Sequence, residues 1–217
     1  MSTEFVHLHL HTEYSLLDGA CRIGELLDYA QQTGVPALAV TEHGNLFSSV
    51  IFHDQARTRG IKPILGCEVY VATGSRHARS GTPGDTNNHL VLLAENLTGY
   101  HNLIKLVSAG YTEGFYYVPR IDREVVERYK EDVIVLTGNL YGEVPSKVLN
   151  QGEKQAEEAL LWWKEQFGED LYVEVMRHGQ EDEDRANQSL VALAKKHEVS
   201  LVATNNTYYC DKKDAEA

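Results

Sequence analysis

Strand-like and helix-like hydrophobic patterns alternate along the chain. Short apolar runs typical of strands occupy residues 5–11, 37–41, 64–72, 89–94, 133–137, 171–176 and 201–204. Apolar residues recur at helical spacing in residues 23–32, 45–58, 153–168 and 185–197. Seven strands that alternate with helices predict a parallel β/α architecture, and the pattern alone does not decide between a barrel and an open sheet. Residues 73–88, rich in Gly, Ser, Pro and Asn, are expected to form a loop.

The first strand-like segment, FVHLHLH, alternates histidine with leucine. Because successive side chains of a β-strand point to opposite faces, His7, His9 and His11 should share one face, and Leu8 and Leu10 the other. Neutral imidazole is the commonest metal-binding side chain, so this pattern can supply two ligands to a metal ion. The alternative is a set of polar positions on a half-buried strand, and this segment alone does not separate the two interpretations.

Other candidate ligands follow the ends of later predicted strands or lie near them: Glu42, His43, Glu68, Asn206 and Tyr208. In parallel β/α folds, functional groups gather at the C-terminal ends of the strands, so these residues should meet His9 and His11 in one mouth. Mixtures of histidine and carboxylate suit zinc, manganese or iron. His89 begins its strand instead, and its spacing alone favours a turn residue.

The composition is that of an ordinary globular domain. The chain has 217 residues, 42% of them hydrophobic, which is enough for one domain over residues 1–217 with a substantial core. No run of about 18 apolar residues is present, and the N-terminus lacks the features of a signal peptide, so no membrane partner is expected. Three widely spaced cysteines fit neither a disulfide framework nor a C-x-x-C zinc site, which favours a reducing, cytoplasmic compartment: Cys21, Cys67 and Cys210.

The charge balance limits the interactions that the chain can make by itself. Its formal net charge is −12, from 20 basic and 32 acidic residues. Nucleic-acid-binding domains usually carry a basic patch, so strong non-specific DNA binding by this chain alone is not expected. Bound divalent cations would offset part of the acidity locally.

Five stretches together resemble the PHP (polymerase and histidinol phosphatase) family: HLHTEYSLLDGA, AVTEHGNL, IKPILGCEVYV, NHLVLLAEN and LVATNNTYY. The resemblance covers essentially the whole chain and is strongest to the PHP domains that begin bacterial DNA polymerase III alpha subunits. It implies a distorted (β/α)7, TIM-like barrel with a metal centre at its mouth. It also implies an N-terminal fragment of a replicative polymerase subunit, whose partners are the rest of that subunit, the replisome and, through the parent protein, DNA.

Six positions match the metal-binding pattern of the family: His9, His11, Asp18, His43, Glu68 and His89. The resemblance therefore implies that His89 is a metal ligand, although its spacing alone favours a turn residue. Three positions depart from the pattern, because Asn139 replaces a cysteine, Asn206 an aspartate and Tyr208 a histidine. An asparagine amide coordinates weakly, and a phenol with a pKa near 10 replaces imidazole poorly. We therefore expect zinc or manganese, in fewer ions than a full trinuclear site, with His9, His11 and Glu68 forming the retained position.

These departures favour a PHP module with weak or absent nuclease activity and a structural role in the polymerase. The first alternative is an active metal-dependent 3′→5′ proofreading exonuclease, which is the activity that the resemblance implies for members with an intact centre. The second is a phosphoesterase of the histidinol phosphatase type, against which the polymerase-like stretch HTEYSLLDGACRIGELL argues. Nucleotidyl transfer is not expected, because no palm with paired acidic residues is present on this chain.

Overall fold

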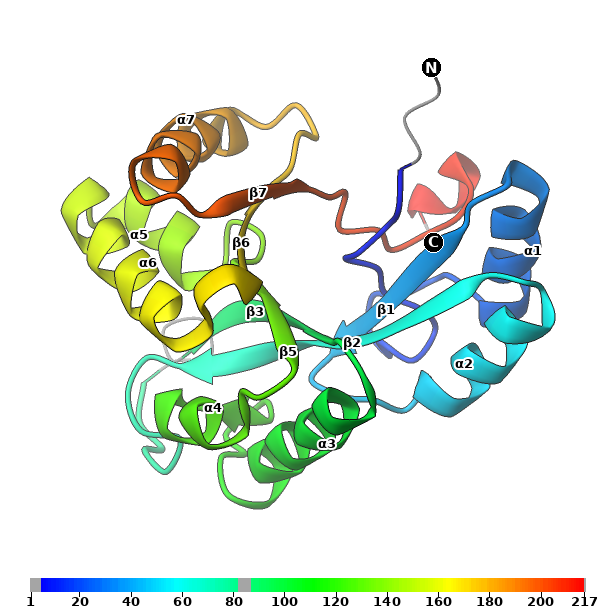
Figure 1. Cartoon of the computed structure of the whole chain (residues 1–217), viewed down its shortest axis with the longest axis horizontal. Helices are drawn as coiled ribbons and strands as arrows, with labels where there is room; N and C mark the ends of the chain where they lie inside the picture. Colours follow the sequence, from blue (N-terminus) through cyan, green and yellow to red (C-terminus); the bar gives the residue numbers. More distant parts are fainter. Residues whose placement is uncertain (1–4, 82–86, 217) are drawn as a thin grey trace.

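A curled, seven-stranded sheet forms the centre of the fold, and helices surround its outer side (Figure 1). The computed structural model describes residues 5–81 and 87–216. The strands are β1 (Ala37–His43), β2 (Lys62–Ala72), β3 (Asn87–Ala94), β4 (Arg120–Ile121), β5 (Val133–Leu136), β6 (Leu171–Val175) and β7 (Ser200–Ala203). The α-helices are α1 (Ile23–Thr33), α2 (Ser49–Thr58), α3 (Leu97–Thr112), α4 (Arg123–Tyr129), α5 (Glu143–Asn150), α6 (Glu153–Phe167) and α7 (Glu181–Lys196).

Most predicted elements lie where the hydrophobic pattern places them. Each of the predicted strands from residue 37 onward overlaps an observed strand and agrees with its ends within two residues. Helix α2 begins later than predicted, because the Asn45 side chain accepts a hydrogen bond from the Phe47 amide and forms a turn there. Helix α7 begins earlier, at Glu181, in a run of acidic residues that favours a helix N-terminus. Within the described residues, no helix is long and apolar enough to cross a membrane.

The prediction of an all-parallel sheet is wrong at β3. Strands β1 and β2 are parallel, and so are β5, β6 and β7, but β3 runs antiparallel to both β2 and β5. Antiparallel strands need no helical crossover, and β2 is followed by the predicted loop instead of a helix. Residues 82–86 of that loop lie outside the described residues. The first residues of β3 therefore lie at the same edge of the sheet as the last residues of β1 and β2.

The predicted N-terminal strand over residues 5–11 is also wrong. This segment forms only an isolated bridge between Leu10 and Thr207. Its backbone nevertheless connects β1 with the segment that follows β7, the two strands at the ends of the sheet. The His7 carbonyl accepts a hydrogen bond from the Ala39 amide (2.9 Å), and the His9 carbonyl accepts one from the Thr207 amide (3.0 Å). The segment thus bonds to two parts of the chain that do not pair with each other, and its side chains do not follow the simple alternation of a strand.

Side-chain alternation divides the sheet into an outer and an inner face. The outer face packs against the helices, where Trp163 of α6 is among the largest fully buried side chains. The inner face carries a smaller apolar layer around Ala39, Val91 and Leu93. Leu8 packs against this inner layer, whereas Leu10 packs on the opposite side against α1 and α2, so the predicted common face for these leucines is wrong.

We expect Gly99→Ala in α3 to destabilise the fold by about 1–3 kcal/mol, the usual cost of overpacking. A Cβ at Gly99 would lie 1.9 Å from the carbonyl oxygen of Asp132, so the helix would have to move away from the turn before β5. Chemical denaturation measures the change. Gly24→Ala in α1 is the matched control, because its nearest neighbouring atom would be 3.9 Å away and alanine favours a helix. Equal stability of the two variants would contradict this packing.

Candidate metal centre

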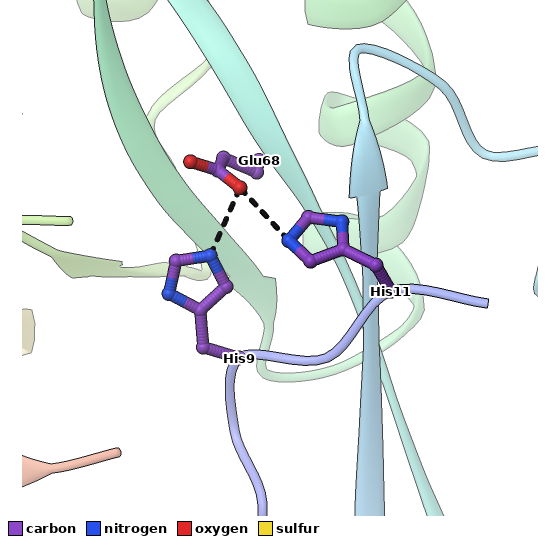
Figure 2. A group of neighbouring side chains, drawn as sticks. All are labelled: His9, His11 and Glu68. Carbon is purple, nitrogen blue, oxygen red and sulfur yellow. Dashed lines mark hydrogen bonds and ion pairs between the residues drawn. The ribbon is translucent and has the colours of Figure 1, made fainter. Parts of the chain in front are cut away.

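The fully buried carboxylate of Glu68 in β2 lies among four histidine side chains. Its Oε2 atom is 2.9 Å from Nε2 of His9 and 2.9 Å from Nε2 of His11, and Figure 2 shows both rings directed at this oxygen. The same oxygen lies 3.3 Å from Nδ1 of His43. The other oxygen, Oε1, lies 2.7 Å from Nδ1 of His89. Residues far apart in the sequence therefore meet at one side chain.

Strand pairing explains why these residues meet. His43, the last residue of β1, is opposite Glu68 in the parallel β1–β2 pair. Glu68 is opposite Val91 of β3, and His89 lies two residues before Val91 on the same inner face. His89 begins its strand and still reaches the centre, because β3 runs antiparallel. The interpretation of His89 as a turn residue, made from spacing alone, was therefore wrong. The structure places His89 beside Glu68, as the family resemblance implies.

The turn after the N-terminal segment carries Asp18, the remaining matched position. Asp18 is half exposed, and its Oδ2 atom lies 3.3 Å from Nε2 of His43. Glu42 stabilises the start of this turn, because its carboxylate accepts hydrogen bonds from the Thr12 amide (3.0 Å) and the Ser15 hydroxyl (2.6 Å). Glu42 lies on the opposite face of β1 from His43, so it supports the turn and does not face the centre.

The donor set of this centre fits a divalent metal ion. Within the described residues, two groups bring their ligand atoms within 4.8 Å of one another: His9, His11 and Glu68, and His43, Glu68 and His89. Nε2 of His11 and Nδ1 of His43 are buried and have no hydrogen-bond partner, although both lie near the Glu68 carboxylate. An imidazole nitrogen and a carboxylate oxygen at such distances need either a proton or a metal ion between them. Imidazole and carboxylate are ligands that zinc and manganese accept.

The histidines differ in protonation, which their surroundings explain. Burial lowers the pKa of His43 to about 4, so this ring is neutral at pH 7, as a metal ligand must be. Burial would also lower the pKa of His9, but the carboxylates of Glu174 and Glu68 outweigh it and raise the pKa to about 10. Burial opposes ionisation of Glu68 as well, but the charge of His9 and the hydrogen bonds from His9 and His89 hold its pKa well below the ordinary value.

Glu174 of β6 is a residue of the centre that the sequence analysis missed. Its Oε1 atom lies 2.9 Å from Nδ1 of His9, and the Thr204 hydroxyl donates to the same oxygen. This contact orients the ring so that Nε2 faces Glu68, an arrangement that commonly supports metal-bound histidines. The signal was a single carboxylate within the otherwise apolar strand LYVEV, which is costly to bury without a partner.

The three substituted positions also lie around the centre. The Asn139 amide donates to Oε1 of Glu68 at 3.3 Å. The Tyr208 ring stacks on His11 at a centroid distance of 4.5 Å, and its hydroxyl lies 3.3 Å from Nε2 of His43. Burial, followed by the charge of Glu68, raises the pKa of Tyr208, so the phenol remains neutral. Neutral groups therefore occupy the space beside Glu68.

Asn206 adopts a left-handed backbone conformation (φ 37°), and its Oδ1 atom is buried without a hydrogen-bond partner. Asparagine tolerates this conformation better than most residues do. The backbone at Asn206 changes the direction of the chain between β7 and Tyr208. Its side chain adds a neutral amide to the lining of the groove beside the centre.

A groove of about 960 Å³ opens beside the centre, between α5 and the N-terminal end of α7. Residues of different character line it, among them Asn139, Tyr141, His178, Arg185, Asn206 and Tyr208. His178 joins its two sides, because its Nδ1 donates to Glu183 (2.6 Å) and its Nε2 donates to the Asn205 carbonyl (2.9 Å). The groove thus reaches the substituted side of the centre.

Comparison with known proteins identifies the family. The family model of the PHP domain matches residues 7–178. The chain belongs to the PHP family. DNA polymerase III subunit alpha from Borreliella burgdorferi is 41% identical over 216 residues, which make up 99% of this chain and 19% of that protein. The same subunit from Aquifex aeolicus is 44% identical over 224 residues, covering 100% of this chain and 19% of that protein.

This PHP domain is thus homologous, along its full length, to part of DNA polymerase III alpha subunits, and it spans about a fifth of their length. A solved structure of an amidohydrolase from Chromobacterium violaceum, described with bound sulfate and no metal, superposes with a TM-score of 0.61 at 15% identity. The match covers 94% of this chain and 87% of that one. The expected PHP-type fold is confirmed, as a mixed α/β fold with a curled half-barrel sheet.

We expect Glu174→Gln to weaken zinc or manganese binding by about 10–100-fold, the usual effect of losing a partner that orients a metal-bound histidine. Isothermal titration of the metal-free PHP domain measures the affinity. Glu183→Gln is the matched control, because Glu183 is also a buried carboxylate bound to a histidine, His178, but does not contact His9. Equal affinities for the two variants would contradict a role for Glu174 in orienting His9.

The His178–Glu183 pair should stabilise the fold in a limited pH range. The hydrogen bond with Glu183 raises the pKa of His178 above its ordinary 6.5, so this contribution is complete below pH 6.5 and is lost as pH rises through the raised value. Burial would raise the pKa of Glu183, but its bonds to His178 lower it below 4.5, so its contribution is complete above pH 4.5 and is lost in stronger acid.

His178→Gln should therefore lower the free energy of unfolding most between about pH 4.5 and 6.5, and less above that range. We expect a loss of about 0.5–1 kcal/mol, because the ring is partly exposed and solvent screens the pair. Urea denaturation at a series of pH values measures it. A loss that grows between pH 6.5 and 9 would have the wrong sign for this ion pair.

Proposed function

We propose that this chain is the PHP module of a replicative DNA polymerase alpha subunit, with a reduced metal centre, a structural role and little or no nuclease activity. The polymerase alpha subunits that match this chain along its full length support the assignment to such a subunit. In this proposal the partners are the rest of the polymerase subunit and the replisome, DNA is contacted through the parent, and the protein works in the cytoplasm. The net charge of −12 agrees with DNA contacts that depend on other domains.

The observation that carries this proposal is the neutral character of the substituted side of the centre. Hydrolysis of a phosphodiester by a metal cluster needs one ion to lower the pKa of a water and others to bind the attacking and leaving oxygens. Asn139 donates a proton toward Glu68 and does not offer a thiolate. Tyr208 presents a neutral phenol to His43 where an imidazole would offer a lone pair. These contacts favour fewer bound ions.

The proposed retained position consists of His9, His11 and Glu68, whose ligand atoms are all buried. A metal ion held there would act as a Lewis acid and would bring together the N-terminal segment and β2. Asp18, His43 and His89 lie close enough to contribute to a second, weaker position. A zinc or manganese ion in the first position would join chain segments and so stabilise the fold.

The second candidate function is an active 3′→5′ exonuclease, and the groove favours it. The groove is large enough for a nucleotide and reaches Tyr208 and Asn206, beside the centre. Tyr141, which is largely exposed and lies 5.5 Å from the His89 ring, could stack on a base. The acidic side chains of the groove and the three neutral positions make this the weaker candidate.

An exonuclease assay with a 5′-labelled single strand and added manganese or zinc separates these functions. We expect no digestion by the native domain above the level of His11→Ala, and about one metal ion per chain by elemental analysis, because Asn139, Asn206 and Tyr208 supply no charged ligands for further ions. Digestion by the native chain that is lost in His11→Ala would contradict the structural proposal and support the exonuclease.

A repaired variant tests whether the three positions are the cause. Asn139→Cys, Asn206→Asp and Tyr208→His together should raise the metal content and create manganese-dependent digestion. Lys62→Ala, at the exposed start of β2 and away from the mouth, is the control for differences between protein preparations. It should leave the metal content and the digestion unchanged. Histidinol phosphate, tested with the same samples, examines the phosphoesterase alternative; its hydrolysis by the native chain would contradict both proposals.

A further inference from the structure

Two cysteine residues from opposite parts of the chain meet beside the turn that carries Asp18. Cys21 is fully buried, and Cys210 is partly buried in the segment after β7. Cys210 packs against the hydrophobic cluster that contains Cys21. The amide of Ala20 donates to the carbonyl of Tyr208 at 2.8 Å, so the backbone holds the two segments together. The wide separation of the cysteines in the sequence concealed this pairing.

The environments of the two thiols differ. A hydrogen bond with Cys210 is the main cause that raises the pKa of Cys21, and burial acts in the same direction. The same bond lowers the pKa of Cys210. Cys210 is the more accessible of the two thiols, so it is the one that a disulfide in solution reaches first. Cys67 differs from both, because it is fully buried, lies in another cluster and donates to the Glu42 carbonyl at 3.3 Å.

We infer that Cys21 and Cys210 are a redox modification site, at which a low-molecular-weight disulfide such as oxidised glutathione forms a reversible disulfide between them. The inference rests on the packing of Cys210 against the cluster that contains Cys21, and on the backbone hydrogen bond beside the two residues. It does not depend on the proposed function of the metal centre.

The reaction balances as two thiol–disulfide exchanges. The thiolate of Cys210 attacks one sulfur of oxidised glutathione, forms a mixed disulfide and releases one glutathione as thiolate. Cys21 then loses its proton to solvent and attacks the Cys210 sulfur, which forms the protein disulfide and releases the second glutathione. The two protein thiols lose two electrons in total, the oxidised glutathione gains them, and the two released thiolates take up the two protons.

The crosslink would join two segments that border the metal centre. One is the turn between Thr12 and Cys21, which carries Asp18, and the other contains Asn206 and Tyr208. None of the residues His9, His11 or Glu68 belongs to the linked pair, so oxidation would fix the rim of the mouth and leave the retained position intact. In a reducing compartment such a bond is transient, as expected for a response to oxidants.

Thiol counting by mass spectrometry tests the inference. The native chain is incubated with oxidised glutathione, denatured without reductant, alkylated with N-ethylmaleimide, and analysed intact and after proteolysis. We expect alkylation of Cys67 alone, a linked peptide pair that contains Cys21 and Cys210, and alkylation of all three cysteines after dithiothreitol. Full alkylation after oxidation, or a glutathione adduct that persists on Cys210 beside a free Cys21, would overturn the inference.

Three variants make the result specific. Cys21→Ser should stop at the mixed disulfide on Cys210, because the second thiol is missing, whereas Cys210→Ser should remain unmodified at Cys21. Cys67→Ala is the matched control, and it should form the same linked peptide pair and retain no free thiol. A linked pair that includes Cys67, or a crosslink between chains in place of the internal one, would contradict the assignment.

Discussion

The burial of the Glu68 carboxylate is the constraint on which the rest of the centre depends. An ionised carboxylate without exposure to water is unstable unless positive charge and hydrogen bonds surround it. Four imidazoles from three parts of the chain supply these contacts. A proton on His9 and a metal ion are alternative ways to balance the same carboxylate, so a metal ion bound at the proposed position would compete with the proton for Nε2 of His9. In that proposal, metal affinity would depend on pH.

The direction of β3 makes this arrangement possible. In a fully parallel sheet, the first residue of a strand lies at the opposite edge from the mouth, and a histidine at the start of β3 would be far from Glu68. The antiparallel pairing with β2 brings His89 to the mouth, whereas Val91 and Leu93 continue into the apolar layer below. One strand thus contributes both a polar residue of the centre and the layer on which the centre rests.

The sequence predicts much of this fold and less of the site's supporting contacts. Apolar runs are local signals, so most strands and the long helix α6 could be located without knowledge of their neighbours. Strand direction and the irregular path of residues 5–11 depend on distant partners such as Thr207 and Ala39, which no local pattern contains. Glu174 was missed for the same reason, because its role exists only through contact with His9. The proximity of the segments that carry Cys21 and Cys210 is likewise a property of the folded chain.

The proposal of a reduced metal centre depends on charge more than on the number of nearby donor atoms. Each further divalent ion adds positive charge that anionic ligands must balance in a partly buried site. Glu68 faces the centre directly, Asp18 contributes from the exposed rim, and the Glu174 carboxylate is engaged by His9 and Thr204. Asn139 places a neutral amide against Glu68, and Tyr208 places a neutral phenol against His43. In the proposed function, Glu68 and Asp18 supply the negative charge for one ion, and the neutral side chains of Asn139, Asn206 and Tyr208 line the side that opens into the groove.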